Sequence, residues 1–201
     1  MNKSMKNIFI ALLCFAVITG CKDERSDLGD KHFKNGEYKE AVKAYTEYLR
    51  LEPTHVKSLY NRGRAYEELG EYEKALADFN KVVKEDPLNT NAYLSITSDY
   101  YYRQQDYENT IFYAEKVLAQ NENSVIAHTL KGKAYQKLGK LQEAMAAYNA
   151  AISVDKEYAD AYLSRGLLRV HLNQISRACA DFQMAASLGS DKAKAVSKKY
   201  C

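Results

Sequence analysis

The sequence predicts an all-α solenoid, a stack of similar helix pairs. The first observation behind this prediction is a period of about 34 residues that runs through most of the chain, and its clearest positions are the glycines Gly29, Gly63, Gly132 and Gly166. A fixed period of this size indicates one supersecondary unit stacked on copies of itself. Such a chain is predicted to be a binding scaffold and not an enzyme.

The second observation is the pattern within one period. Apolar residues recur at helical spacing in two runs of about a dozen residues, which in the second unit are residues 58–70 and 72–83. The pair Gly70-Glu71 separates the two helices, and Asp86-Pro87 ends the second one.

The third observation is that the periodic glycines fall inside the first helix of each pair, where glycine costs about 1 kcal/mol relative to alanine. This repeated cost predicts a close approach of the partner helix. Alanines are expected to face the glycines, with aromatic residues one turn further on filling the space beside them. The alanines are Ala41, Ala75, Ala144 and Ala178, and the aromatic residues are Tyr45, Phe79, Tyr148 and Phe182.

Residues 1–20 have the pattern of a signal peptide. Lys3 and Lys6 precede the apolar run 8–18, which is shorter than the roughly 20 residues that span a bilayer. The segment Ile18-Thr19-Gly20-Cys21 then resembles a bacterial lipobox. The resemblance implies cleavage before Cys21, acylation of that cysteine and anchoring by its lipid chains, with residues 21–25 as a short lead. The alternative is an ordinary secretory signal with an incidental cysteine.

The segment Lys22-Asp23-Glu24 resembles the signal that exports some Bacteroidetes lipoproteins to the cell surface. A solvated start to the first helix explains these three residues equally well. The expected localisation is therefore the bacterial outer membrane, either at the cell surface or on the periplasmic face.

Residues 26–190 are expected to form the repeat domain. Five units start near Lys22, Val56, Thr90, Val125 and Ala159. Each resembles the tetratricopeptide repeat (TPR), which has a small residue at position 8, aromatic residues at positions 11 and 24, alanine at position 20 and proline at position 32. The resemblance implies a right-handed superhelical solenoid of about five helix-turn-helix units.

The third unit is irregular. Thr97 replaces the glycine, Thr110 the alanine and Ala114 the aromatic residue, and one extra residue falls between Tyr100 and Tyr107. We expect this helix pair to be looser than its neighbours or rotated relative to them.

Residues 191–201 are expected to form a capping helix with a polar outer face. A basic membrane-binding tail at Lys198-Lys199 is the alternative. Cys179 and Cys201 lie ten residues before and twelve residues after Gly189, so a helical hairpin brings them to nearly the same height. A disulfide is predicted, and the alternative is one buried cysteine and one free terminal thiol.

The charge balance argues against nucleic acid as a partner. Residues 21–201 hold 27 of the 29 basic residues, because Lys3 and Lys6 precede them, and all 26 acidic residues. A nucleic-acid binder would show a basic stripe. No Gly/Ser-rich or Pro-rich linker interrupts the chain, which predicts one domain.

The TPR resemblance implies that the first helices line a concave groove that binds an extended peptide or a helix. Aromatic and basic side chains dominate the centre of this face, and at least one residue of Tyr100-Tyr101-Tyr102 must pack between repeats. The expected groove residues are Lys57, Tyr60, Arg64, Glu67, Leu94, Ser98, Tyr101, Tyr102, Thr129, Lys133, Gln136, Lys137, Leu163, Leu167 and His171.

Other site chemistries are not supported by the sequence. The lysine–asparagine clamp with which some cytosolic TPR proteins grip a chaperone carboxylate is replaced by Ser26 and Asp30. The four histidines share no metal-ligand spacing, and the scattered Asp and Glu residues are expected on solvated faces. We therefore expect no cofactor, no metal and no catalysis.

Two functions remain open. The first is an outer-membrane lipoprotein that holds partner proteins or peptides in its groove. The second is a surface-exposed accessory lipoprotein that captures an extracellular ligand for uptake. The short lead after Cys21 holds the domain against the membrane, which favours a membrane-associated partner.

Overall fold

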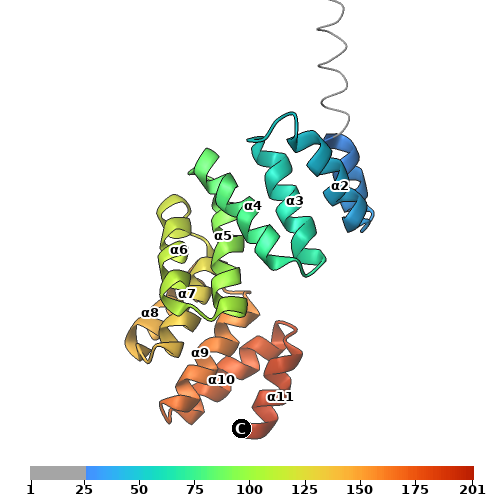
Figure 1. Ribbon diagram of the computed structural model, residues 1–201. Coiled ribbons are helices and arrows are strands. Elements are labelled where there is room, and N and C mark those ends of the chain that lie inside the picture. Colours follow the sequence, from blue (N-terminus) through green and yellow to red (C-terminus); the bar gives the residue numbers. More distant parts are fainter. Residues whose placement is uncertain (1–25) are drawn as a thin grey trace, which may run out of the picture. The chain divides into compact units, whose positions relative to one another are not determined.

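The computed structural model describes residues 26–201, which fold into helices joined by short turns (Figure 1). These residues divide into two compact units, unit 1 up to Asn89 and unit 2 from Thr90 to Cys201. The predicted signal peptide, the lipid site Cys21 and the lead 21–25 lie outside the described residues.

Unit 1 contains two helix pairs. Its helices are residues 26–34, α2 (Tyr38–Leu49), α3 (Val56–Glu68) and α4 (Tyr72–Glu85). Helix α2 packs on α3, and α3 packs on α4. The side chain of His55 caps α3 by accepting a hydrogen bond from the N–H of Ser58 at 3.3 Å.

Unit 2 contains three further pairs and a terminal helix. Its elements are α5 (Thr90–Asp99), the π-helical turn η1 (Tyr100–Gln104), α6 (Tyr107–Gln120), α7 (Val125–Lys137), α8 (Leu141–Val154), α9 (Ala159–His171), α10 (Ile175–Ser187) and α11 (Asp191–Tyr200). Consecutive helices pack on each other from α5 to α11. The first helices also touch in sequence, α5 with α7, α7 with α9 and α9 with α11, so within unit 2 they form one layer.

The first helix of each pair ends in a residue with left-handed backbone. Three of these residues are glycines, of which Gly70 and Gly139 have φ of +73°. Two are not: Gln105 has φ of +54° and Asn173 has φ of +57°. Glycine adopts this conformation without a steric penalty. Gln105 and Asn173 adopt the same left-handed backbone although each carries a side chain.

The periodic glycines make room for aromatic rings. A Cβ atom at Gly29, Gly63, Gly132 or Gly166 would lie 2.5–2.6 Å from a ring carbon of the second helix. The rings are Tyr45, Phe79, Tyr148 and Phe182, and each is at most 1% exposed. The rings are thus the nearest neighbours of the glycines, and Ala41, Ala75, Ala144 and Ala178 are buried as well.

In the third helix pair the larger and smaller side chains of this contact are exchanged between the two helices. Thr97 stands in place of the glycine and Ala114 in place of the aromatic ring, and both are fully buried. The larger side chain is thus on the first helix and the smaller one on the second. The hydroxyl of Thr97 donates to the carbonyl oxygen of Tyr93 at 2.7 Å, so its burial leaves no unsatisfied donor.

The extra residue of this third unit is taken up inside the first helix. Residues Tyr100–Gln104 form a π-helical turn, which holds one residue more than an α-helical turn. The turn closes when the N–H groups of Gln105 and Asp106 both donate to the carbonyl oxygen of Tyr100. The helix therefore resumes the common turn geometry at Gln105.

Two buried ion pairs correct the expectation that the acidic residues lie on solvated faces. Asp78 and Asp181 are only 3% exposed. Arg62 donates to Asp78 from Nε at 2.7 Å and from a terminal nitrogen at 2.8 Å. Arg165 donates to Asp181 in the same bidentate geometry, from Nε at 3.1 Å and from a terminal nitrogen at 2.7 Å. Full pairing is what makes burial of these charges tolerable.

Both arginines also reach the preceding repeat. Arg62 donates to the hydroxyl of Thr46 at 3.1 Å, and Arg165 donates to the side-chain oxygen of Asn149 at 2.7 Å. These contacts join the second helices of successive repeats through one guanidinium.

The last helix covers the end of unit 2. Ala193 is fully buried and Val196 is partly buried against the core cluster that includes Tyr162 and Phe182. Helix α11 also contacts α9, and it thus takes the place that a further first helix would occupy. Cys201, which follows α11, forms a disulfide with Cys179 of α10, and their Cα atoms are 5.8 Å apart.

Substitution Gly132→Ala tests the contact with the ring of Tyr148. In an ordinary helix this change stabilises by about 1 kcal/mol. Here the added methyl group forces the ring to move, and overpacking of about 1–3 kcal/mol leads us to expect net destabilisation in chemical denaturation. In the Tyr148→Leu background the same change should cost less, and an equal cost in both backgrounds would contradict the contact.

The disulfide is predicted to contribute stability to the cap. It closes a loop with a sequence separation of 22 residues. Cys201→Ser should therefore lower the free energy of unfolding by on the order of 3 kcal/mol. Peptide mapping of unreduced protein should find Cys179 and Cys201 in one linked fragment, whereas two alkylated peptides would show that the bond is absent.

Candidate functional site

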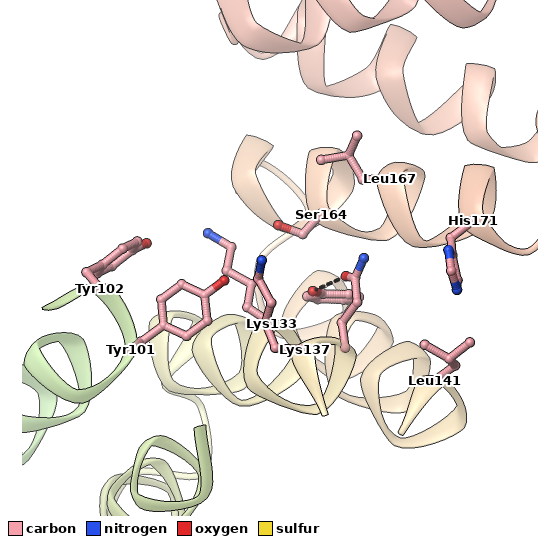
Figure 2. A pocket seen from close by; sticks show the side chains of 10 residues that line it. Tyr101, Tyr102, Lys133, Lys137, Leu141, Ser164, Leu167 and His171 are labelled. Carbon is pink, nitrogen blue, oxygen red and sulfur yellow. Dashed lines mark hydrogen bonds between the residues drawn. The ribbon is translucent and has the colours of Figure 1, made fainter. Parts of the chain in front are cut away.

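A hollow of about 440 Å³ opens on unit 2 (Figure 2). Its walls come from the first helices of three successive repeats, and the second helix α8 adds part of the floor. The lining residues are Tyr101, Tyr102, Lys133, Gln136, Lys137, Leu141, Tyr148, Ser164, Leu167 and His171.

Helical periodicity explains why these side chains converge. On α7, Lys133, Gln136 and Lys137 are spaced at i, i+3 and i+4, so they share one face. On α9, Ser164, Leu167 and His171 are spaced at i, i+3 and i+7, which also places them on one face. In Figure 2 the side chains of Lys133, Lys137, Ser164 and His171 point into the space between these two helices, and Tyr101 and Tyr102 lie to the left of it.

Lys133 is held as a charged group in the wall. Its side chain is 17% exposed, and its Nζ lies 2.6 Å from Oδ2 of Asp160. Burial lowers the pKa of Lys133, but the hydrogen bond and charge of Asp160 outweigh that effect and raise the pKa overall. The ammonium group also lies 6.0 Å from the centre of the Tyr102 ring, within range of a cation–π interaction.

Tyr148 forms the floor and connects it to the core. Its ring packs against Gly132, and its hydroxyl donates to Oε1 of Gln136 at 2.9 Å. Burial raises the pKa of Tyr148, with further upward contributions from Tyr101 and Asp160. The phenol is thus a neutral donor, and Gln136 keeps its NH₂ group for a ligand.

The remaining lining residues combine apolar surface with positive charge. Tyr102 is 62% exposed and Leu167 is 39% exposed. Lys137 and His171 are exposed as well, and within residues 26–201 neither forms an ion pair. A surface of tyrosine, leucine and hydrogen-bond donors suits a peptide, because tyrosine gives large contact area at low entropic cost.

The structure brings together seven of the predicted groove residues. They are Tyr101, Tyr102, Lys133, Gln136, Lys137, Leu167 and His171. Leu141, Tyr148 and Ser164 line the same hollow but were missing from the prediction. The sequence pattern identified Tyr148 only as a buried aromatic residue of the core. A phenylalanine would serve that purpose equally well, so the hydroxyl group of Tyr148 was the feature that could have indicated a role in the site.

Four predicted residues of unit 2 do not line the hollow. Thr129 and Leu163 are buried, which corrects their assignment to the groove. The hydroxyl of Thr129 donates to the carbonyl oxygen of Val125 at 2.8 Å, and Leu163 belongs to the core beneath α11. Leu94 packs against the cluster around Ala114, and Ser98 is not among the lining residues.

The predicted residues of unit 1 take part in local contacts. The ring of Tyr60 lies 5.7 Å from that of Phe79, and Nε of Arg64 lies 2.9 Å from the carboxylate of Glu67. Lys57 pairs with Asp30 at 2.6 Å.

Ser26 and Asp30, which replace the carboxylate clamp, serve contacts between repeats. The hydroxyls of Ser26 and Ser58 are 3.0 Å apart. Asp30 accepts hydrogen bonds from Tyr45 at 2.6 Å and from Asn61 at 2.9 Å. Burial raises the pKa of Asp30, but Lys57 and these two donors lower it overall, so the carboxylate stays charged.

The described part of the chain contains no group of three or more side chains that could hold a metal ion. Among helices in residues 26–201, none has both the length and the apolarity that crossing a membrane requires.

Family models match three stretches of the chain. A model described as tetratricopeptide repeat matches residues 26–90, and a second, described as TPR repeat, matches residues 132–173. A model described as anaphase-promoting complex, cyclosome, subunit 3 matches residues 79–151. The first two matches fall on unit 1 and on α7 to α9 of unit 2.

A protein relative matches most of the chain. The chain is 27% identical over 194 residues to a DnaJ homolog subfamily C member 3 homolog of Dictyostelium discoideum, which is 89% of this chain and 39% of that protein. It therefore spans about two fifths of the length of that relative.

Solved structures are similar over most of the chain. MamA superposes with a TM-score of 0.75 and 26% identity over 86% of this chain and 94% of its own. YrrB, a TPR protein with an unusual peptide-binding site, superposes with a TM-score of 0.74 and 18% identity over 92% of this chain and 97% of its own. The likeness to YrrB shows the fold alone.

Proposed function

Because the chain is a tetratricopeptide repeat protein, a scaffold for protein or peptide interactions, we propose that it binds a segment of a partner protein in the hollow of unit 2. The observation that carries this proposal is the convergence of three successive first helices on one hollow with aromatic, apolar and cationic walls. The hollow needs no chemical step to serve this function.

The size and lining of the hollow support a peptide as its occupant. A volume of about 440 Å³ lies within the roughly 300–1,000 Å³ of typical ligand sites. An apolar side chain of the partner would pack between Tyr101 and Leu167. The amide of Gln136 and the ammonium of Lys137 would then bind the partner's carbonyl or acidic groups.

We further propose that the protein is anchored to the outer membrane by lipid chains on Cys21. The lipobox-like segment 18–21 and the positive, apolar leader before it support this. Residues 22–25 give a short tether, so the repeats lie close to the bilayer and a membrane-associated partner is favoured.

A second function is favoured by one feature, the segment Lys22-Asp23-Glu24. If it directs export, the domain faces the medium and captures an extracellular ligand for uptake. Protease digestion of intact and lysed cells separates the two functions, because only a surface-exposed domain is cleaved before lysis.

Site-specific photocrosslinking tests the hollow. A photoreactive benzophenone amino acid at position 102 should give discrete adducts with a partner in native membranes. The matched control is position 112 on α6, because Phe112 is 50% exposed in the same unit and does not line the hollow. Leu167→Arg, which fills the hollow with a charged side chain, should abolish the adducts at position 102. Equal adducts at both positions, unaffected by Leu167→Arg, would contradict the site.

Substitution Cys21→Ala tests the anchor. The unmodified chain should move from the membrane fraction to the soluble fraction and lose metabolic labelling by a palmitate analogue. The loss is expected because each buried methylene contributes about 0.8 kcal/mol to membrane binding. Cys201→Ser serves as the matched control and should leave labelling unchanged. Retained labelling of Cys21→Ala would rule out this lipid site.

A further inference from the structure

A second hollow lies on unit 2, outside the proposed peptide site. It has a volume of about 450 Å³, and its walls come from the second helices α8 and α10 and the end of α9. Its lining residues are Leu141, Gln142, Met145, Asn149, Arg169, Leu172, Gln174 and Arg177. Leu141 is the one residue that both hollows share, and no acidic residue lines the second one.

The wall of this hollow carries excess positive charge. Arg165 and Arg169 both pair with Asp181, and the charge of Arg177 acts on Arg169. Arg165 already binds Asp181 through two hydrogen bonds, and Arg169 adds a third at 2.7 Å. Two guanidinium groups thus share one carboxylate, and Arg177, unpaired within residues 26–201, adds a further positive charge to the lining of the hollow.

Arg169 is the residue most affected by this imbalance. Its side chain is 18% exposed, and its buried Nε–H has no hydrogen-bond acceptor among residues 26–201. Burial lowers the pKa of Arg169, and the charges of Arg165 and Arg177 lower it further, against the opposing effect of Asp181. An anion in the hollow would relieve this repulsion.

Hydrogen-bond donors complete the lining. The side-chain oxygen of Asn149 accepts from Arg165, so the NH₂ group of Asn149 is left for a ligand. Arg177 is exposed, and its guanidinium has no carboxylate partner within the described residues. The hollow thus offers amide and guanidinium donors above an apolar base of Leu141, Met145 and Leu172.

We propose that this second hollow binds an acidic segment of a partner protein, with the carboxylates on Arg169 and Arg177 and the aliphatic side chains on the apolar base. Charge complementarity supports a carboxylate-bearing partner. The volume supports a peptide over a bare ion, because a hollow of about 450 Å³ holds several side chains. The proposal does not depend on occupation of the first hollow.

Fluorescence anisotropy with a labelled peptide tests this inference. The probe is the octapeptide (Glu-Leu)₄, titrated at low ionic strength with the full chain in detergent micelles, and (Gln-Leu)₄ is its neutral counterpart. Arg177→Gln and Arg169→Gln should each weaken binding of (Glu-Leu)₄ by about fivefold to tenfold. Lys192→Gln removes the same charge from an exposed position of α11 that lines neither hollow, and it should change binding less than twofold.

Arg177→Gln tests the second hollow even if Arg169→Gln disturbs the fold. Arg177 makes no side-chain contact with Asp181, so Arg177→Gln is expected to melt like the parent protein and to report on binding alone. Unchanged affinity in Arg177→Gln, or equal affinity for (Gln-Leu)₄, would overturn the proposal.

Two further outcomes identify other occupants. Loss of (Glu-Leu)₄ binding in Lys137→Gln, with both arginine variants unaffected, would place acidic segments in the first hollow and overturn the second site, while the proposed function would stand. Saturable binding of inorganic phosphate without binding of (Glu-Leu)₄ would overturn the peptide as occupant and assign the hollow to a free oxyanion.

Discussion

In four of the five helix pairs within residues 26–201, an aromatic ring of the second helix lies where a Cβ atom of the first helix would otherwise be. The contact at Gly132 shows how much depends on it, because the ring of Tyr148 rests there and no larger residue leaves it room. The spacing of the two helices is therefore set by ring thickness. This spacing in turn places every side chain that points out of the pair.

The same ring connects the core to the first hollow. The hydroxyl of Tyr148 holds Gln136, which stands on the face of α7 that also carries Lys133 and Lys137. A displacement of the ring would therefore reach the floor of the site directly. The side chain of Tyr148 thus contacts Gly132 with its ring and lines the hollow with its hydroxyl end.

The irregular third pair contributes the other wall of this hollow. In this pair Thr97 stands in place of the glycine and Ala114 in place of the aromatic ring. Both residues are buried, so the interface is filled without a contact between a glycine and a ring. The π-helical turn that follows adds a residue at Tyr100–Gln104, and Tyr101 and Tyr102 lie on that turn. Single π-helical turns are frequent at functional sites, and here the turn carries the most exposed aromatic residue of the hollow.

The sequence allowed much of this arrangement to be predicted, because periodicity reports directly on stacking. The 34-residue period identified the helix pairs, and the resemblance to the tetratricopeptide repeat placed Lys133, Gln136 and Leu167 on one surface. It could not show that Thr129 is buried, since a threonine that bonds its own helix backbone needs no solvent.

The buried charges were hidden for a related reason. Acidic residues are normally solvated, so a buried one can be recognised only if the basic residue that pairs with it is also identified. The equal spacing of 103 residues between Arg62 and Arg165 and between Asp78 and Asp181 was the signal that could have shown it. The second hollow was beyond sequence reasoning, because its lining comes from three helices whose adjacency depends on the packing itself.

The central claim is that the first helices of unit 2 form the surface that a partner covers. Maleimide labelling of Lys137→Cys tests it most directly, compared between native membranes and purified protein, with Glu108→Cys on α6 as the reference. The account predicts that position 137 is labelled several-fold more slowly in native membranes than in purified protein, while position 108 is labelled equally in both. Equal labelling of position 137 in the two preparations would contradict it.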